Sequence, residues 1–355
     1  MNHPLAGGAE VSTHEHAKSW VKAGHSVTQF SASFPGCLRK EDVDGVTIIR
    51  RGNQYTVHLH AYIYYKRHLE NTMDLIVDEF HGIPFFTPLY VNKKKLAYIH
   101  ETAEEIWFRN KAFPLNVVGF FVEKLSFILY RTIPLMTVSE STKRDLIRFN
   151  IPEKNIYVIY NGLHSLNSFA KKENKPTLIY LGRLAKDKGV LDAVDAFFQV
   201  HMEFSDSVFW IVGREETKGY RAEVERRIKE LGLQDSVRFF GHISEKSKFD
   251  LLKKAWILIH PSIKEGWGFT VMEAASQRTP CVGYDIAGLR DSILDKKTGL
   301  LAKNKDIDDL VRKISLLFKD EKLYNSLSEN AFEWSKKFNW DKSTKQSLKL
   351  IESIV

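Results

Sequence analysis

Short runs of β-branched and aromatic residues alternate with longer helical stretches through the second half of the chain. Such alternation indicates repeated βα units, which form a mainly parallel sheet with helices on both faces. Ligands of such sheets bind beyond the carboxyl ends of the strands, so the loops after the strands are the first places to search for a site. The predicted strands are Thr177–Leu181, Val208–Val212, Val237–Phe240, Ile257–Ile259 and Cys281–Tyr284.

The first half repeats this pattern less regularly, and a polar stretch without periodicity at 163–176 is typical of an interdomain linker. A length of 355 residues also favours two or three domains. We therefore expect an α/β protein of two Rossmann-like, doubly wound domains, 1–163 and 164–335, that face each other across a cleft. In the first domain the predicted strands are 26–30, 46–50, 75–77, 96–99, 135–138 and 157–159.

The start of the first domain is unusual. Gly7 and Gly8 lead directly into a helical stretch that ends near Gly24, and no strand precedes them. A βα domain normally begins with its central strand, and the strands beside a missing one would keep unpaired backbone groups at about 1 to 3 kcal/mol each. We expect the missing strand about ten to fifteen residues upstream. The alternatives are that another segment fills the gap or that the domain is loosened.

Composition and charge exclude several classes of protein. The chain is 43% hydrophobic, which is too apolar for a disordered chain, and Cys37 and Cys281 are too few for a disulfide scaffold. A reducing, cytoplasmic location follows as the expectation. The net charge of +8 is spread through both halves instead of forming a basic stripe. This distribution suits anionic small molecules or a weakly anionic membrane surface better than nucleic acid, and an ordinary solvated surface is equally compatible.

The most apolar stretch, 112–131, is interrupted by Glu123 and Lys124 and is not a membrane-spanning segment. Its helical spacing favours a buried core helix over a membrane-surface helix, and both interpretations are kept. The start of the chain lacks the pattern of a signal peptide.

The common cofactor motifs are missing from the sequence. There is no G-x-G-x-x-G after a strand and no G-x-x-x-x-G-K-[ST], so a nicotinamide oxidoreductase or a P-loop enzyme has little support. Two D-x-D strings and two H-x-H pairs lack further ligands at suitable spacing, so we expect no metal.

The loop after the predicted strand 177–181 carries two cations. Gly182 and Arg183 follow the strand, and Lys188 precedes Gly189 at the start of a helix. Glycine permits close backbone approach, while Arg and Lys near a helix N-terminus suit a diphosphate. A basic surface loop is the alternative.

A second loop carries two glutamates on either side of a Gly-rich turn. Glu265 precedes Gly268, Phe269 and Thr270, and Glu273 follows in the next helix. The glycines of the turn leave backbone N–H groups at the helix start that can bind an anion. Glu265 is placed to point into the cleft, and Glu273 is placed to reach a ribose. The alternative for Glu273 is a capping box with Thr270, which would only start the helix.

These residues resemble the donor-binding domain of the GT4 group of retaining GT-B glycosyltransferases. The phrase EGWGFTVMEAAS carries the Glu265-x7-Glu273 motif, preceded by Gly182-Arg183 and Lys188-Gly189. Further matches extend over nearly the whole chain: GGAE at 7–10, AGHSVT at 23–28, YIHE at 98–101, VSEST at 138–142, YNGL at 160–163 and AGLRDSI near 287. The sequence departs from the family at His100-Glu101, where His-Asp is usual, and at Arg214, where a second glycine is more common.

The resemblance implies a role for each matching position. Arg183 and Lys188 hold the diphosphate, Glu265 contacts donor-sugar hydroxyls, Glu273 binds the ribose, and His100 faces the sugar. Gly8 and Gly182 allow the backbone to approach the donor. Gly268, Phe269 and Thr270 bring backbone amides to the diphosphate. The helix in 336–355 is expected to return to the first domain.

The expected function is transfer of a hexose, with retention of configuration, from a nucleotide diphosphate sugar to a hydroxyl of a glycan, glycolipid or small molecule. No cofactor and no metal are expected, and peripheral binding to the inner face of a membrane is left open. One alternative is a catalytically silent GT-B partner subunit or a sugar-nucleotide-binding protein, suggested by the missing strand. A nicotinamide-dependent oxidoreductase is the other.

Overall fold

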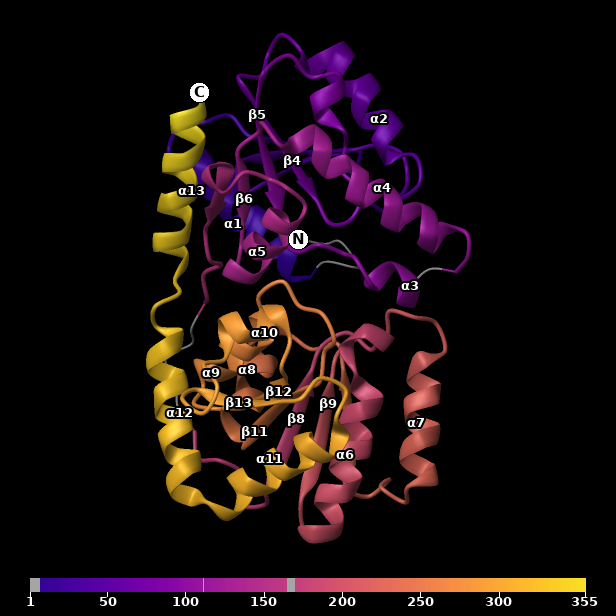
Figure 1. Cartoon of the computed structure of the whole chain (residues 1–355), viewed down its shortest axis with the longest axis vertical. Coiled ribbons are helices and arrows are strands. Elements are labelled where there is room, and N and C mark those ends of the chain that lie inside the picture. The colour runs from indigo at the N-terminus through magenta and orange to yellow at the C-terminus, as the bar shows by residue number, and fades with distance from the viewer. Residues whose placement is uncertain (1–6, 111, 165–169) are drawn as a thin grey trace. The chain divides into compact units, whose positions relative to one another are not determined.

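The structure, a computed structural model, describes residues 7–110, 112–164 and 170–355 (Figure 1). The chain divides into two compact units. The N-terminal unit comprises Met1–Trp107, Phe113–Gly162 and Asn339–Val355, and the C-terminal unit comprises Phe108–Ala112 and Leu163–Phe338. Part of the predicted linker, residues 165–169, lies outside the described residues.

The C-terminal unit contains a six-stranded parallel sheet in the order β10-β9-β8-β11-β12-β13. Five of these strands were predicted, and β13 was not. All five residues of β8 are buried, as expected for a central strand covered on both faces. The strands are β8 (Thr177–Leu181), β9 (Val208–Val212), β10 (Val237–Gly241), β11 (Ile257–His260), β12 (Cys281–Tyr284) and β13 (Gly299–Ala302).

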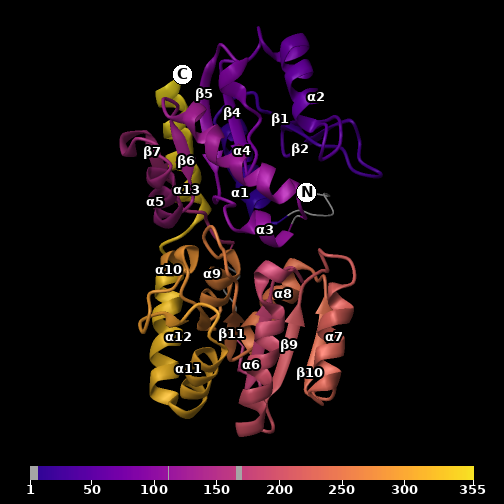
Figure 2. The same ribbon diagram turned by 45° about the vertical axis from the view of Figure 1, so that its right-hand side comes forward.

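Helices cover both faces of this sheet. One layer packs α6 against α7 and α11, and the other packs α9 against α8 and α12 (Figure 2). The helices are α6 (Val190–Glu203), α7 (Tyr220–Glu230), α8 (Glu245–Lys254), α9 (Phe269–Ala275), α10 (Ala287–Ser292), α11 (Ile307–Lys319) and α12 (Glu321–Ser335), with a short 3₁₀ turn η4 (Lys186–Lys188) before α6.

The N-terminal unit contains two sheets where a single Rossmann-like sheet was expected. One has the order β1-β3-β2, with β2 antiparallel to β3, and the other is parallel in the order β4-β5-β6-β7. Figure 2 shows β1 and β2 apart from β4. The strands are β1 (Thr28–Ser31), β2 (Lys40–Val43), β3 (Val46–Arg50), β4 (Leu75–Phe80), β5 (Lys94–Ile99), β6 (Leu135–Thr137) and β7 (Ile156–Val158).

The remaining helices are α1 (Gly8–Lys22), α2 (Val57–Tyr64), α3 (Ile106–Asn110), α4 (Leu115–Tyr130), α5 (Glu140–Arg148) and α13 (Trp340–Ile354), with short turns η1 (Tyr65–Leu69), η2 (Thr87–Leu89) and η3 (Glu153–Asn155). Among them, α13 packs on α1 and β5. Trp20 Nε1 donates to Ser347 Oγ at 3.1 Å, and Ser343 Oγ donates to the carbonyl of Tyr160 at 2.6 Å. The last helix therefore belongs to the N-terminal unit.

Helix α4 buries one face and exposes an apolar stripe on the other, so it is not a fully buried core helix. Its buried side includes Glu123, Ser126 and Phe127. The exposed stripe recurs every three or four residues and comprises Leu115, Val118, Phe121, Leu125 and Ile128, each more than half exposed. Among the described residues, no helix combines the length and the apolar character needed to cross a bilayer.

Candidate functional site

The winding of the C-terminal unit determines where a ligand can bind. The chain builds outward from β8 through β9 to β10, then returns to place β11 on the other side of β8. Loops after β8 and β11 consequently diverge at this switch point, where doubly wound sheets bind their ligands. Gly182 and Arg183 follow β8, and His260 is the last residue of β11.

The buried His260 and the partly buried Lys188 and Glu265 form one polar cluster at this point. Lys188 Nζ donates to Glu265 Oε1 at 2.7 Å, and His260 Nε2 lies 3.1 Å from the same oxygen. Burial alone would raise the pKa of Glu265, but the Lys188 charge and the hydrogen bond from His260 hold it below its usual value. The carboxylate is therefore an anion fixed between two nitrogen donors.

The charge of Glu265 acts on Arg183, but the Arg183 side chain pairs with a residue outside this cluster. Its guanidinium forms an ion pair with Glu216, which lies after β9. Burial opposes the charge, yet the carboxylates of Glu216, Asp187 and Glu265 together raise the pKa of Arg183. Arg183 is thus held in its charged form by carboxylates, and a diphosphate that binds it would have to replace Glu216.

Glu273 is paired with a lysine from another helix. Lys248 Nζ of α8 donates to Glu273 Oε1 at 2.6 Å. Burial raises the pKa of Glu273, and the Lys248 charge offsets only part of that effect. The capping-box interpretation is wrong, because the helix cap is Gly268 and Thr270 lies inside α9. Oγ1 of Thr270 instead lies 3.4 Å from His260 Nδ1.

Two glycines allow the site loops to touch. Gly189 has a φ of +68° and is the N-cap of α6, and an added Cβ would lie 2.0 Å from the carbonyl oxygen of Pro261. A Cβ on Gly288 would lie 1.9 Å from the carbonyl oxygen of Glu265. Only glycine lets the loop after β8 and helix α10 approach the loop after β11 this closely.

The N-terminal unit holds a separate group around His100. This residue directly follows β5 and is 7% exposed. Its Nε2 lies 3.0 Å from Oε1 of Glu79 on β4, and its ring centroid lies 4.2 Å from that of Tyr98. Gly8 is the first residue of α1, preceded by Gly7, whose N–H donates to Glu10 Oε2 at 2.7 Å.

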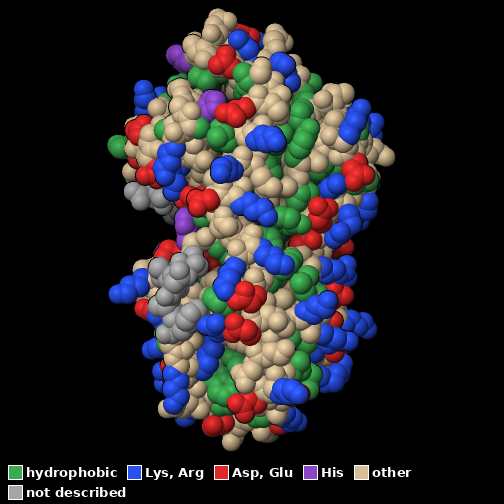
Figure 3. Space-filling model, turned by 90° about the vertical axis from the view of Figure 1, so that its left-hand side faces the viewer, with side chains coloured by type: hydrophobic (Ala, Val, Ile, Leu, Met, Phe, Trp, Pro, Cys, Tyr) green, Lys and Arg blue, Asp and Glu red, His purple; other side chains and the backbone are tan. Residues whose placement is uncertain are grey.

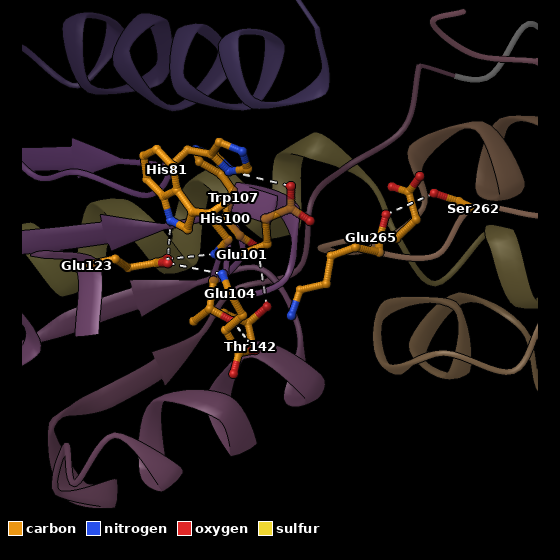
Figure 4. A network of polar contacts seen from close by, with 12 residues as sticks. His81, His100, Glu101, Glu104, Trp107, Glu123, Thr142, Ser262 and Glu265 are labelled. Carbon is orange, nitrogen blue, oxygen red and sulfur yellow. Dashed lines mark hydrogen bonds and ion pairs between the residues drawn. The ribbon is translucent and has the colours of Figure 1, made fainter. Parts of the chain in front are cut away.

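The loop after His100 is held by one buried carboxylate. Glu123 of α4 accepts hydrogen bonds from the N–H of Ala103 at 2.6 Å, the N–H of Glu104 at 3.0 Å and Nε1 of Trp107 at 2.9 Å (Figure 4). Thr142 also donates to the carbonyl of His100 at 3.2 Å. The backbone position of His100 is therefore fixed by α4 and α5.

Charged side chains of both signs mix on the face drawn in Figure 3, and the residues that the structure describes contain no candidate metal cluster. Figure 3 shows Lys and Arg interspersed with Asp and Glu across one face. Within residues 7–110, 112–164 and 170–355, no group of three or more His, Cys, Asp or Glu is arranged to hold a metal ion.

The predicted residues fall into several groups. Lys188 and Glu265 are in contact, Gly268, Phe269 and Thr270 form the start of α9, and Gly182 follows β8 beside Arg183. His100 and Gly8 lie in the N-terminal unit. Sequence reasoning missed the partners of the charged residues, which are His260, Glu216, Lys248 and Glu79. His260 had a usable signal, because it ends a strand at the switch point.

Two family models together match almost the whole chain. The model described as "Glycosyltransferase Family 4" matches residues 6–165, and the one described as "Glycosyl transferases group 1" matches residues 165–334.

Curated relatives are similar over most of the chain. An uncharacterized glycosyltransferase of Methanocaldococcus jannaschii is 26% identical over 289 residues, covering 76% of this chain and 71% of the relative. Two further uncharacterized glycosyltransferases of that organism are matched over 60% and 53% of their length. The N,N'-diacetylbacillosaminyl-diphospho-undecaprenol α-1,3-N-acetylgalactosaminyltransferase of Campylobacter jejuni is 26% identical, covering 84% of this chain and 82% of the relative.

Solved structures share the fold. Sucrose-phosphate synthase from Thermosynechococcus elongatus superposes with a TM-score of 0.82 at 19% identity, covering 98% of this chain and 94% of that chain. The Anabaena protein HepE in complex with UDP-glucose gives a TM-score of 0.77 at 16% identity, covering 99% and 98%.

Proposed function

The chain belongs to the group 1 (GT4) glycosyltransferases of GT-B fold, and from that premise we propose that it transfers a hexose from a nucleotide diphosphate sugar to a hydroxyl acceptor with retention of configuration. The observation that carries the proposal is the Lys188–Glu265–His260 cluster at the switch point of the C-terminal sheet. The UDP-glucose complex of the Anabaena neighbour supports a nucleotide-sugar donor.

The roles follow from the charges in the cluster. Lys188 and Arg183 neutralise the diphosphate as charge grows on the departing phosphate oxygens. Glu265, held anionic and fixed in place, accepts hydrogen bonds from donor-sugar hydroxyls, and Glu273 does the same for the ribose. The start of α9 at Gly268, Phe269 and Thr270 supplies backbone N–H groups to the diphosphate. Gly182 leaves room for it.

In the N-terminal unit, His100 and Gly8 are proposed to contact the sugar and the donor phosphate. The three hydrogen bonds to Glu123 would hold the His100 loop in place during the reaction. Retention is proposed to follow a front-face route, in which the leaving phosphate oxygen helps to take the acceptor proton.

A thermal-shift panel of UDP-, GDP- and ADP-glucose tests the donor class. The true donor at about 100 times its dissociation constant should stabilise the protein by about 2.7 kcal/mol. Transfer or hydrolysis of the labelled sugar from that donor then tests turnover. Absence of any shift with all three donors would contradict the proposal.

We expect Arg183→Ala and Lys188→Ala each to weaken nucleoside diphosphate binding and to slow turnover by about 10- to 1,000-fold, because each removes a charge-assisted contact to the leaving group. Calorimetric titration with UDP, or with the diphosphate that the panel selects, measures the first effect, and initial rates measure the second. EDTA should leave the rate unchanged, since side chains neutralise the diphosphate in this proposal.

Arg226→Ala is the matched control. Arg226 lies on the exposed surface of α7, where it pairs only loosely with Glu230 at 3.8 Å. If Arg183→Ala and Lys188→Ala bind and turn over like this control, the diphosphate binds elsewhere. A strict requirement for added Mg²⁺ or Mn²⁺ would show that Arg183 and Lys188 are not sufficient to neutralise the diphosphate.

The split sheet of the N-terminal unit favours a second candidate function. Among the described residues, β1 and β4 belong to different sheets. The alternative to an active transferase is therefore a subunit that binds sugar nucleotide without turnover. Donor binding in the thermal-shift panel, combined with no sugar transfer or hydrolysis, would favour this candidate.

Peripheral binding to a membrane is proposed through the exposed stripe of α4. The stripe is apolar over five positions, and the protein carries an excess of positive charge, a combination that suits an anionic lipid surface. The acceptor in the name of the Campylobacter relative is a lipid-linked sugar, which fits a membrane-bound reaction.

We expect the double substitution Phe121→Glu and Leu125→Glu to abolish most binding to vesicles of phosphatidylglycerol and phosphatidylcholine, because two charges replace apolar contact at the centre of the stripe. Cosedimentation measures the bound fraction. The control is Met202→Glu, at a side chain that is 73% exposed on α6. Equal binding by the two variants would exclude α4 as the lipid-binding surface.

A further inference from the structure

His260 is the member of the Lys188–Glu265–His260 cluster that lies in a strand. It ends β11, pairs in register with Gly283 of β12, and is 5% exposed. Glu265 lies in the loop between β11 and α9, and Lys188 ends the short turn η4. Side chains on strands hold a position more precisely than side chains on loops. The ring of His260 is therefore the rigid support for a carboxylate that a loop presents.

The charge of Glu265 fixes the direction of its hydrogen bond with His260. Although burial opposes ionisation, the Lys188 charge and the hydrogen bond from His260 keep the pKa of Glu265 below its usual value. An ionised carboxylate only accepts hydrogen bonds, so Nε2 of His260, 3.1 Å away, carries the hydrogen. In the neutral ring Nδ1 is then an acceptor, and Oγ1 of Thr270 lies 3.4 Å from it. The hydroxyl of Thr270 is thus placed to favour the tautomer that donates to Glu265.

Both nitrogen donors contact the same oxygen of Glu265. Lys188 Nζ lies 2.7 Å from Oε1 and His260 Nε2 lies 3.1 Å from it, and neither contact involves Oε2. An ammonium group on a flexible stem leaves a carboxylate free to turn about its last bond. A second donor on a rigid ring restrains that rotation. Oε2 then keeps one orientation in which it can accept hydrogen bonds from a ligand.

We propose that His260 is a positioning residue for sugar transfer, which holds Oε1 of Glu265 through Nε2–H so that Oε2 accepts hydrogen bonds from hydroxyls of the donor sugar. This role rests on the proposed transferase function. Because His260 acts through Glu265, its loss should lower the rate of transfer more than the affinity for the diphosphate. Its contribution should also vanish when Glu265 has no carboxylate to hold.

Two amide substitutions separate the roles of the two ring nitrogens. Nε2 of a glutamine is the same number of bonds from Cβ as Nε2 of a histidine, whereas Nδ2 of an asparagine matches Nδ1. His260→Gln therefore keeps a donor for Glu265, and His260→Asn keeps only the contact toward Thr270. Initial rates give kcat and KM. Calorimetric titration with UDP, or with the diphosphate that the thermal-shift panel selects, gives the affinity.

His201→Asn is the matched control. His201 lies in the last turn of α6, where Nδ1 is 3.1 Å from Oγ of Ser207 and Nε2 is 3.2 Å from Oγ of Ser236. It therefore uses both ring nitrogens within the C-terminal unit but contacts no member of the cluster. Its substitution should lower stability through the lost hydrogen bonds and leave kcat unchanged.

His260→Asn should lower kcat about 10- to 100-fold, as expected for a lost hydrogen bond to a charged group, while the diphosphate dissociation constant changes less than about threefold. His260→Gln should keep kcat within about threefold of the wild-type chain, because its amide replaces the donor. In a chain that already carries Glu265→Ala, His260→Asn should lower the remaining rate no further, because the two residues act as one unit.

The positioning role fails if the wild-type chain transfers sugar and His260→Asn turns over like His201→Asn. It also fails if His260→Gln and His260→Asn lower kcat equally, or if His260→Asn slows the Glu265→Ala chain as much as the wild-type chain. Diphosphate affinity that falls in step with kcat would show that His260 only supports the loop. A wild-type chain that transfers no sugar from any donor would instead overturn the proposed function, and this role with it.

Discussion

Glu265→Gln should reduce sugar transfer by at least about 100-fold while leaving nucleoside diphosphate affinity unchanged or slightly higher. The substitution keeps the size of the side chain but removes the charge that Lys188 and His260 hold in place. A neutral amide accepts hydrogen bonds from the donor-sugar hydroxyls more weakly than the carboxylate does. Lys188, freed from its carboxylate partner, remains available to the diphosphate, so binding is not lost.

Initial rates and calorimetric titration with the diphosphate alone separate the two effects. Glu225→Gln is the matched control, because Glu225 pairs with Arg221 on the surface of α7 and lies outside the cluster. The assignment of Glu265 fails if its variant turns over within about threefold of this control. Loss of diphosphate binding in parallel with turnover would instead indicate a collapsed loop, which circular dichroism and the melting temperature would reveal.

The strands of the C-terminal unit were largely predictable because they are buried on both faces. Each inner strand is a continuous apolar run, and such runs differ clearly from amphipathic helices. The two missed strands lie at sheet edges. β2 is polar and alternates between exposed and half-buried residues, and β13 begins with Gly299 against the carbonyl of Cys281. β2 therefore lacks the apolar pattern that sequence reasoning reads, and β13 is only four residues long.

The cations and carboxylates of the site were predictable by type, but their pairing was not. Lys188 and Glu265 are 77 positions apart, and Lys248 and Glu273 are 25 apart. Their contacts depend on which loops meet at the switch point, a property of strand order that local pattern does not record. The capping box failed for a local reason. Gly268 adopts a φ of +80° and is the N-cap of α9, so Thr270 lies inside the helix and does not cap it.

Gly189→Ala is expected to destabilise the C-terminal unit by at least about 3 kcal/mol. A left-handed conformation costs a non-glycine residue about 1 to 2 kcal/mol, and the added Cβ would also lie 2.0 Å from the carbonyl oxygen of Pro261. That carbonyl belongs to backbone, which cannot rotate away as a flexible side chain would. Relief therefore requires the loop after β8 and the loop after β11 to separate, and Lys188 would be carried away from Glu265.

Gly232→Ala isolates the clash from the backbone strain. Gly232 has a φ of +71°, close to that of Gly189, but its added Cβ would meet nothing within 4 Å. Its cost should be about 1 kcal/mol, since alanine also restricts the unfolded chain. Native-state hydrogen exchange of the β8 and α6 amides measures both variants within the C-terminal unit alone. Equal destabilisation would mean that the two loops separate without cost, so their contact would not fix the distance between Lys188 and Glu265. A larger loss of stability in Gly189→Ala than in Gly232→Ala, accompanied by weaker diphosphate binding, would show that the approach of Gly189 to Pro261 holds Lys188 and Glu265 together.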